Sequence, residues 1–158
     1  MVRKLTIIAV FLFRFFAIFG QSENEYHYQD EDKYHFIELS TVSVYQFIEL
    51  LKIDSNDTSK VNILTIGMTA SENWVSQEDI DTLIILINST KPAKCVMQII
   101  SSYLPIGENS TIGGQVMNII EAYKDKKLYP NALTSCAKTD EERIKKIKQW
   151  WDEQKKQD

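Results

Sequence analysis

Residues 76–100 read SQEDIDTLIILINSTKPAKCVMQII, and their apolar spacing predicts two consecutive helices. Ser76 precedes an acidic first turn, which complements the positive end of a helix dipole. Pro92 stands where a helix tolerates proline, in the first turn, and Pro105 ends the second segment. The two apolar stripes at helical spacing are Ile80, Leu83, Ile84 and Ile87, and then Val96, Ile99, Ile100 and Tyr103.

The same spacing recurs on both sides of this segment. A cap at Ser40 or Thr41 precedes a helix toward the amino end, Thr111 or Gly113 opens one toward the carboxyl end, and Thr139 begins a last helix with a capping box. The three further stripes are Val44, Phe47, Ile48 and Leu51; Val116, Ile119, Ile120 and Tyr123; and Ile144, Ile147 and Trp151.

The fold class follows from these segments and their repeat distance. Val44, Ile80 and Val116 each begin a stripe and are 36 residues apart. The sequence therefore predicts an all-α single domain of about six helices, either an antiparallel bundle or stacked helical hairpins with a period near 36 residues. Residues 60–68 stay open between helix and strand, because their apolar residues also alternate as they do in a strand.

The amino-terminal residues have the layout of a signal peptide. Arg3 and Lys4 precede an apolar run at 5–13, and even residues 5–19 fall short of the roughly 20 apolar residues that a membrane-spanning helix needs. We predict a signal peptide at 1–20, an acidic extended leader at 21–37 and a helical domain at 38–158. We expect secretion into the extracellular space without integral membrane association, with an uncleaved anchor as the alternative.

Secretion gives the cysteines and three asparagines a covalent role. Cys95 and Cys136 have only each other as intramolecular partners, so we expect a disulfide that ties the fourth predicted helix to the basic linker before the last one. A free nucleophilic thiol is the alternative, but both histidines lie far from it in sequence. Asn56, Asn88 and Asn109 each begin an Asn-X-Thr triplet without proline, which predicts N-glycosylation.

The sequence offers little for catalysis or metal binding. His27 and His35 flank the acidic residues 30–32, a set that could hold a transition metal weakly, but a solvated leader is the simpler interpretation. Ser101 and Ser102 lack the glycines and the preceding strand of a nucleophile elbow. We therefore predict no catalytic, cofactor-binding or metal-binding residues.

The last predicted helix mixes lysines with Trp150 and Trp151. Residues 138–158 carry seven positive and six negative side chains, a balance too even to draw the helix to anionic lipid. Trp151 belongs to the apolar stripe and is expected in the core. Trp150 lies beside the stripe, and it is the best single candidate for a contact with a partner.

Residues 92–136 resemble secreted helical proteins of unknown function that occur as expanded families in nematodes. The resemblance rests on Cys95, Ser101-Ser102, Leu104-Pro105, Gly107-Glu108, the turn at Thr111 to Gln115, and Tyr129-Pro130. It covers about a third of the chain and implies a small secreted helical protein. It implies no activity, cofactor or site residue.

Net charge and composition limit the classes of function that the chain can have. Removing residues 1–20 leaves 15 Lys and Arg against 22 Asp and Glu, a net charge of −7, which argues against nucleic acid as a partner. We expect a secreted, N-glycosylated interaction protein that binds an extracellular protein or glycan through a surface face. One alternative is a carrier with a small apolar ligand in its helical core; the other is an enzyme without a recognisable motif. The carrier's cavity would be lined by Ile84, Ile99, Met117 and Ile120.

Overall fold

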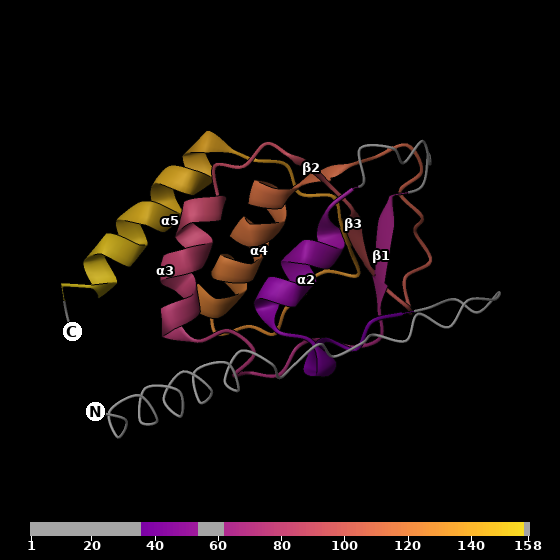
Figure 1. Cartoon of the computed structure of the whole chain (residues 1–158), viewed down its shortest axis with the longest axis horizontal. Helices are drawn as coiled ribbons and strands as arrows, with labels where there is room; N and C mark the ends of the chain where they lie inside the picture. The colour runs from indigo at the N-terminus through magenta and orange to yellow at the C-terminus, as the bar shows by residue number, and fades with distance from the viewer. Residues whose placement is uncertain (1–35, 54–61, 157–158) are drawn as a thin grey trace, which may run out of the picture. The chain divides into compact units, whose positions relative to one another are not determined.

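The structure is a computed structural model that describes residues 36–53 and 62–156 (Figure 1). The predicted signal peptide and most of the predicted leader lie outside these residues. The described elements, in chain order, are η1 (Leu39–Thr41), α2 (Val44–Leu51), β1 (Ile63–Ile66), α3 (Gln77–Leu86), β2 (Pro92–Ala93), β3 (Cys95–Gln98), β4 (Ser110–Thr111), α4 (Ile112–Lys124), β5 (Thr134–Ser135) and α5 (Glu141–Gln154).

The all-α prediction is wrong, because the described residues contain a mixed three-stranded sheet. Its strand order is β1-β3-β5, with β1 parallel to β3 and β5 antiparallel to β3. Ile37 adds a parallel bridge to Ile66 on the outer side of β1. A second, two-stranded sheet pairs β2 with β4. The described helices are therefore four α-helices and one short 3-10 turn, not six helices.

The error falls mainly on residues 92–103, which were expected to form the fourth helix. Cys95–Gln98 is instead the central strand, and Ile100 and Tyr103 follow it in an exposed loop. A short buried strand reads as a run of apolar residues, and such a run matches helical spacing equally well over four residues. Residues 60–68, left open, contain β1, whose residues alternate in burial as the strand interpretation required.

The other four predicted helices are confirmed as α2, α3, α4 and α5. In α3 the Ser76 side chain accepts a hydrogen bond from the Asp79 amide, and Asp79 accepts one in return from the Ser76 amide, so a capping box starts the helix. Asp140, rather than Thr139, caps α5 through the Arg143 amide. Helices α2, α3 and α4 begin at Val44, Gln77 and Ile112, which are 33 and 35 residues apart, and strands lie between them. The stacked helical hairpins predicted with a period near 36 residues are therefore not found among the described residues.

Helices α2, α3 and α4 cover one face of the sheet, and α5 packs against α3 and α4 on the side away from the strands (Figure 1). The core lies between these layers and is almost entirely apolar. Leu64, Ile66 and Val96 supply its sheet side. Fully buried side chains from the helices complete it, among them Phe47, Leu51, Ile80, Leu83, Met117 and Ile120.

Candidate interaction surface

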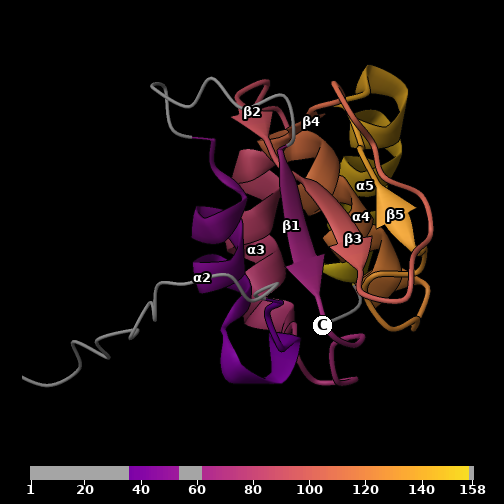
Figure 2. The same ribbon diagram turned by 90° about the vertical axis from the view of Figure 1, so that its right-hand side faces the viewer.

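Large apolar side chains lie exposed along the carboxyl edge of the three-stranded sheet. Phe36, Met68, Ile99, Ile100 and Leu133 have exposed fractions of 44%, 68%, 47%, 72% and 50%. In Figure 2 the arrowheads of β1 and β3 point to this edge, while β2 and β4 lie at the opposite end of the two strands. We call these five residues the carboxyl-edge row.

Backbone hydrogen bonds hold the first two members beside the end of β1. The N–H of Ile37 donates to the Thr65 carbonyl at 2.9 Å, and the N–H of Gly67 donates to the Ile37 carbonyl at 3.0 Å. Phe36 precedes Ile37 in the chain, and Met68 follows Gly67. Gly67 permits the approach, because the Glu38 carboxylate and the Phe36 ring both lie where a Cβ atom at position 67 would stand. The Glu38 carboxylate therefore lies beside this end of the row.

The other three members lie beside the ends of β3 and β5. The N–H of Ile99 donates to the Ile66 carbonyl at 2.9 Å, and the N–H of Gln98 donates to the Leu133 carbonyl at 2.8 Å. Ile100 follows Ile99 directly in the chain. The row therefore crosses every strand of this sheet, and each of its segments is fixed by a bond to its neighbour.

The loop after β3 extends the apolar surface. Residues 95–107 contain no Asp, Glu, Lys or Arg. The Ser101 and Thr134 hydroxyl oxygens lie 2.7 Å apart, which ties the start of the loop to β5. The Tyr103 hydroxyl donates to Glu108 at 2.8 Å, a bond within the loop. Its exposed apolar side chains beyond the row are Tyr103, Leu104 and Ile106.

The predicted cysteine pair is confirmed. Cys95 and Cys136 form a disulfide, with Cα atoms 4.5 Å apart. The bridge joins β3 to the residue after β5, where a helix and a linker were expected. Cys95 is in register with Ile63 on the sheet face that the helices leave uncovered.

Two of the three predicted glycosylation sites lie at the amino end of the strands, opposite the row. Asn88 follows α3 and is exposed, and its Oδ1 accepts a hydrogen bond from Lys148 of α5 at 3.4 Å. Asn109 precedes β4, is partly buried, and its Oδ1 accepts one from Asn62, which precedes β1, at 2.9 Å. Asn56 lies outside the described residues.

The predicted contact residue Trp150 is half-buried on α5. Its ring lies 6.4 Å from that of Tyr123, edge to face, and the Lys124 ammonium lies 6.0 Å from the ring centre. Trp151 is buried, as predicted, and its indole N–H donates to Asp81 of α3 at 3.0 Å. Both tryptophans thus have partners within the fold, and Trp150 keeps one exposed side.

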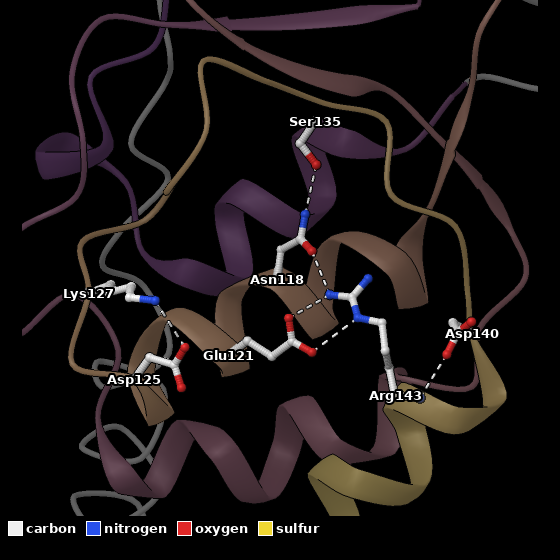
Figure 3. A network of polar contacts seen from close by, with 7 residues as sticks. All are labelled: Asn118, Glu121, Asp125, Lys127, Ser135, Asp140 and Arg143. Carbon is white, nitrogen blue, oxygen red and sulfur yellow. Dashed lines mark hydrogen bonds and ion pairs between the residues drawn. The ribbon is translucent and has the colours of Figure 1, made fainter.

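A polar network centred on Arg143 joins α4, α5 and β5 (Figure 3). Arg143 donates to both oxygens of Glu121, at 3.0 and 2.7 Å, and to Asn118 Oδ1 at 2.7 Å. The Asn118 amide in turn donates to Ser135 Oγ at 2.7 Å. A guanidinium held by this many acceptors fixes the position of α5.

One buried polar pair lies inside the core. Tyr129 donates its hydroxyl hydrogen to Gln115 Oε1 at 3.3 Å, and the Gln115 amide donates to the Ser135 carbonyl at 3.0 Å. Burial raises the pKa of the Tyr129 phenol far above its usual value. The Trp74 ring stacks on that of Tyr129, with ring centres 5.6 Å apart. This pair is sealed from solvent and serves packing.

Residues proposed for other functions are not brought together. Ile99, expected to line a carrier cavity, lies at the sheet edge, whereas Met117 and Ile120 are fully buried in α4. Within residues 36–53 and 62–156, no three His, Cys, Asp or Glu side chains are grouped to hold a metal ion. His27 and His35 lie outside those residues.

Sequence analysis missed the carboxyl-edge row because its members come from four separate segments. One signal was available: the uncharged run at 95–107 is too long for the strand that it contains, which leaves an apolar remainder outside the sheet. Assigning Ile99 and Ile100 to a helical core hid that remainder.

The described helices are all too short or too polar to cross a membrane. The resemblance to secreted nematode proteins stays a prediction. Comparisons with protein-family models, with curated proteins and with solved structures find no match to this chain.

Proposed function

We propose that this chain is a secreted interaction protein and that the carboxyl-edge row is its binding surface. The observation that carries the proposal is the exposure of five large apolar side chains from backbone segments that are hydrogen-bonded neighbours at one sheet edge. Single exposed apolar residues are normal on a protein surface, but a contiguous apolar patch is typical of a binding site.

The surroundings of the row support this role. The backbone bonds of Ile99 and Gln98 hold the edge in a fixed geometry, so binding would order few groups. Asn88 and Asn109 lie at the other end of the strands, and glycans attached there would leave the row accessible. The partner is an extracellular protein with an apolar surface of its own, in keeping with the predicted signal peptide.

Binding to an array of purified extracellular proteins tests this function. We expect the mature chain to bind at least one array protein, and Ile100→Lys to weaken that binding at least about tenfold by placing a charge in an apolar contact. Ile85→Lys is the matched control, because Ile85 is 75% exposed on α3, away from the row. It should bind like the wild type.

Two outcomes would contradict the proposal. Equal loss of binding in the Ile85 and Ile100 variants would show a non-specific effect of the added charge. Loss in Trp150→Ala, with full binding by Ile100→Lys, would instead place the contact on α5, where sequence analysis expected it. Circular dichroism of each variant controls for folding.

A further inference from the structure

We propose that the partner of the carboxyl-edge row is a second copy of this chain, with the two rows packed against each other across a twofold axis. The inference rests on the proposed function of the row as a binding surface, and it names the occupant. It uses three features of the described residues: the area of the row, the apolar character of its five members, and its place at one end of the sheet.

The area of the row matches what a specific dimer needs. With roughly 200 Å² for a fully exposed large side chain, the exposed fractions of its five members correspond to on the order of 550 Å² of apolar surface per copy. Two facing rows would bury at most on the order of 1,100 Å², which clears the about 1,000 Å² minimum for a biological interface and lies just below the about 1,200–2,000 Å² of a standard one. The exposed loop residues Tyr103, Leu104 and Ile106 can add to this area.

The chemistry of the row favours a copy of itself over a charged or polar partner. All five members are aliphatic or aromatic, and the loop that follows Ile100 carries no charge before Glu108. Homodimer interfaces are more apolar than the contacts of transient complexes, whose polarity resembles that of the ordinary surface. A twofold contact places the same patch on both sides, so an apolar row meets an apolar row.

The position of the row leaves room for a second copy. The row lies where β1 and β3 end, whereas β2 and β4 lie where those strands begin (Figure 2). Asn109 accepts a hydrogen bond from Asn62, which precedes β1, and Asn88 precedes Ser89, whose carbonyl accepts one from Gly113 at the start of α4. Two copies joined end to end through their rows would therefore point these asparagines away from each other. Glycans on them would not obstruct the dimer.

Sedimentation velocity of the secreted mature chain between about 1 and 100 μM tests the inference. We expect the wild type and the control Ile85→Lys to be dimers at the upper concentration. Ile100→Lys should raise the dimer dissociation constant about a hundredfold, because it buries an unpaired charge. Leu133→Lys, from a different segment of the same row, should have the same effect and serves if the first variant misfolds.

A wild type that stays monomeric at about 100 μM would overturn the inference. Photo-crosslinking from position 100 then identifies the occupant, since a crosslink within the same chain would show that the row is covered by another segment of it. A monomer that still binds array proteins through Ile100 would leave the proposed function standing and remove only the dimer. A dimer unaffected by both lysine variants would place the interface elsewhere.

Discussion

Gly113 and Gly114 show how single residues decide the path of this chain. Both lie in the first turn of α4. A Cβ atom at Gly113 would meet the Ile87 carbonyl oxygen, and one at Gly114 would meet the Ala137 carbonyl oxygen. These contacts are with backbone, which cannot turn away as a side chain can. The start of α4 therefore needs both glycines.

We expect Gly114→Ala to lower the free energy of unfolding by about 3 kcal/mol, because the segment at Ala137 must move. Gly107→Ala is the comparison. Gly107 has a φ of 75° and nothing near its Cβ position, so only backbone strain of about 1–2 kcal/mol is expected there. Urea denaturation measures both. Equal losses at the two positions would contradict the packing argument.

The Tyr129 phenol provides a second test at this scale. Burial raises its pKa, so the phenol stays protonated in the folded chain at a pH where an unfolded tyrosine, with a pKa near 10, ionises. Above about pH 10 the folded state then binds one more proton than the unfolded state, and the free energy of unfolding falls by up to about 1.4 kcal/mol per pH unit. Below about pH 10 the Tyr129 phenol is protonated in both states, so its contribution to the free energy of unfolding does not change with pH.

Tyr129→Phe removes this proton and should therefore show a shallower loss of stability between about pH 10 and 11 than the wild type. Urea denaturation at pH 9, 10 and 11 compares the two slopes. Identical slopes would mean that the phenol ionises freely in the folded chain. The wild type at pH 9 is the reference, because unfolded tyrosine is still mostly protonated there.

At the scale of elements, local signals predicted the helices and long-range pairing decided the strands. Ser76 and its acidic first turn identify α3 because a capping box is made within four residues. β3 has no such local signal. Its assignment depends on β1, which lies about 30 residues earlier and pairs with it from Ile63 with Cys95 onward. A four-residue apolar run cannot show by its spacing alone which structure it adopts.

The two neighbouring tryptophans of α5 separate core packing from surface contact. Trp151 is buried and bonded to Asp81, so Trp151→Ala should lower the free energy of unfolding by about 3–5 kcal/mol. Trp150 is half-buried against Tyr123, and its replacement by alanine should cost about 1 kcal/mol. Thermal unfolding followed by circular dichroism gives both values. A larger loss of unfolding free energy for Trp150→Ala than for Trp151→Ala would show that Trp150, and not Trp151, is the core residue.

The disulfide links two elements that lie far apart in sequence. Cys95 and Cys136 close a loop with a sequence separation of 41 residues. Replacing both with alanine should lower the free energy of unfolding by about 4 kcal/mol on the chain-entropy account. Wild type unfolded in the presence of reductant is the control and should match the double variant. A difference under about 1 kcal/mol from oxidised wild type would contradict this role.

At the scale of the whole molecule, tertiary structure creates a surface that no single segment contains. Phe36, Met68, Ile100 and Leu133 come from four separate segments, and only the strand order gathers them on one edge. The sequence could therefore predict the disulfide partners and the buried Trp151, which depend on composition and local period. It could not predict the row, because a wrong assignment of β3 turns Ile99 and Ile100 inward.

Side-chain footprinting tests most directly whether the carboxyl-edge row is a contact surface. Carbene labelling of the native protein in the fluid into which we propose that it is secreted is compared with labelling of the purified protein at high dilution. We predict that the members of the row lose labelling together in the fluid, because a partner covers them, while Ile85 is labelled equally in both samples. Equal labelling of the row in the two samples, or protection of Ile85 to the same degree, would contradict the account.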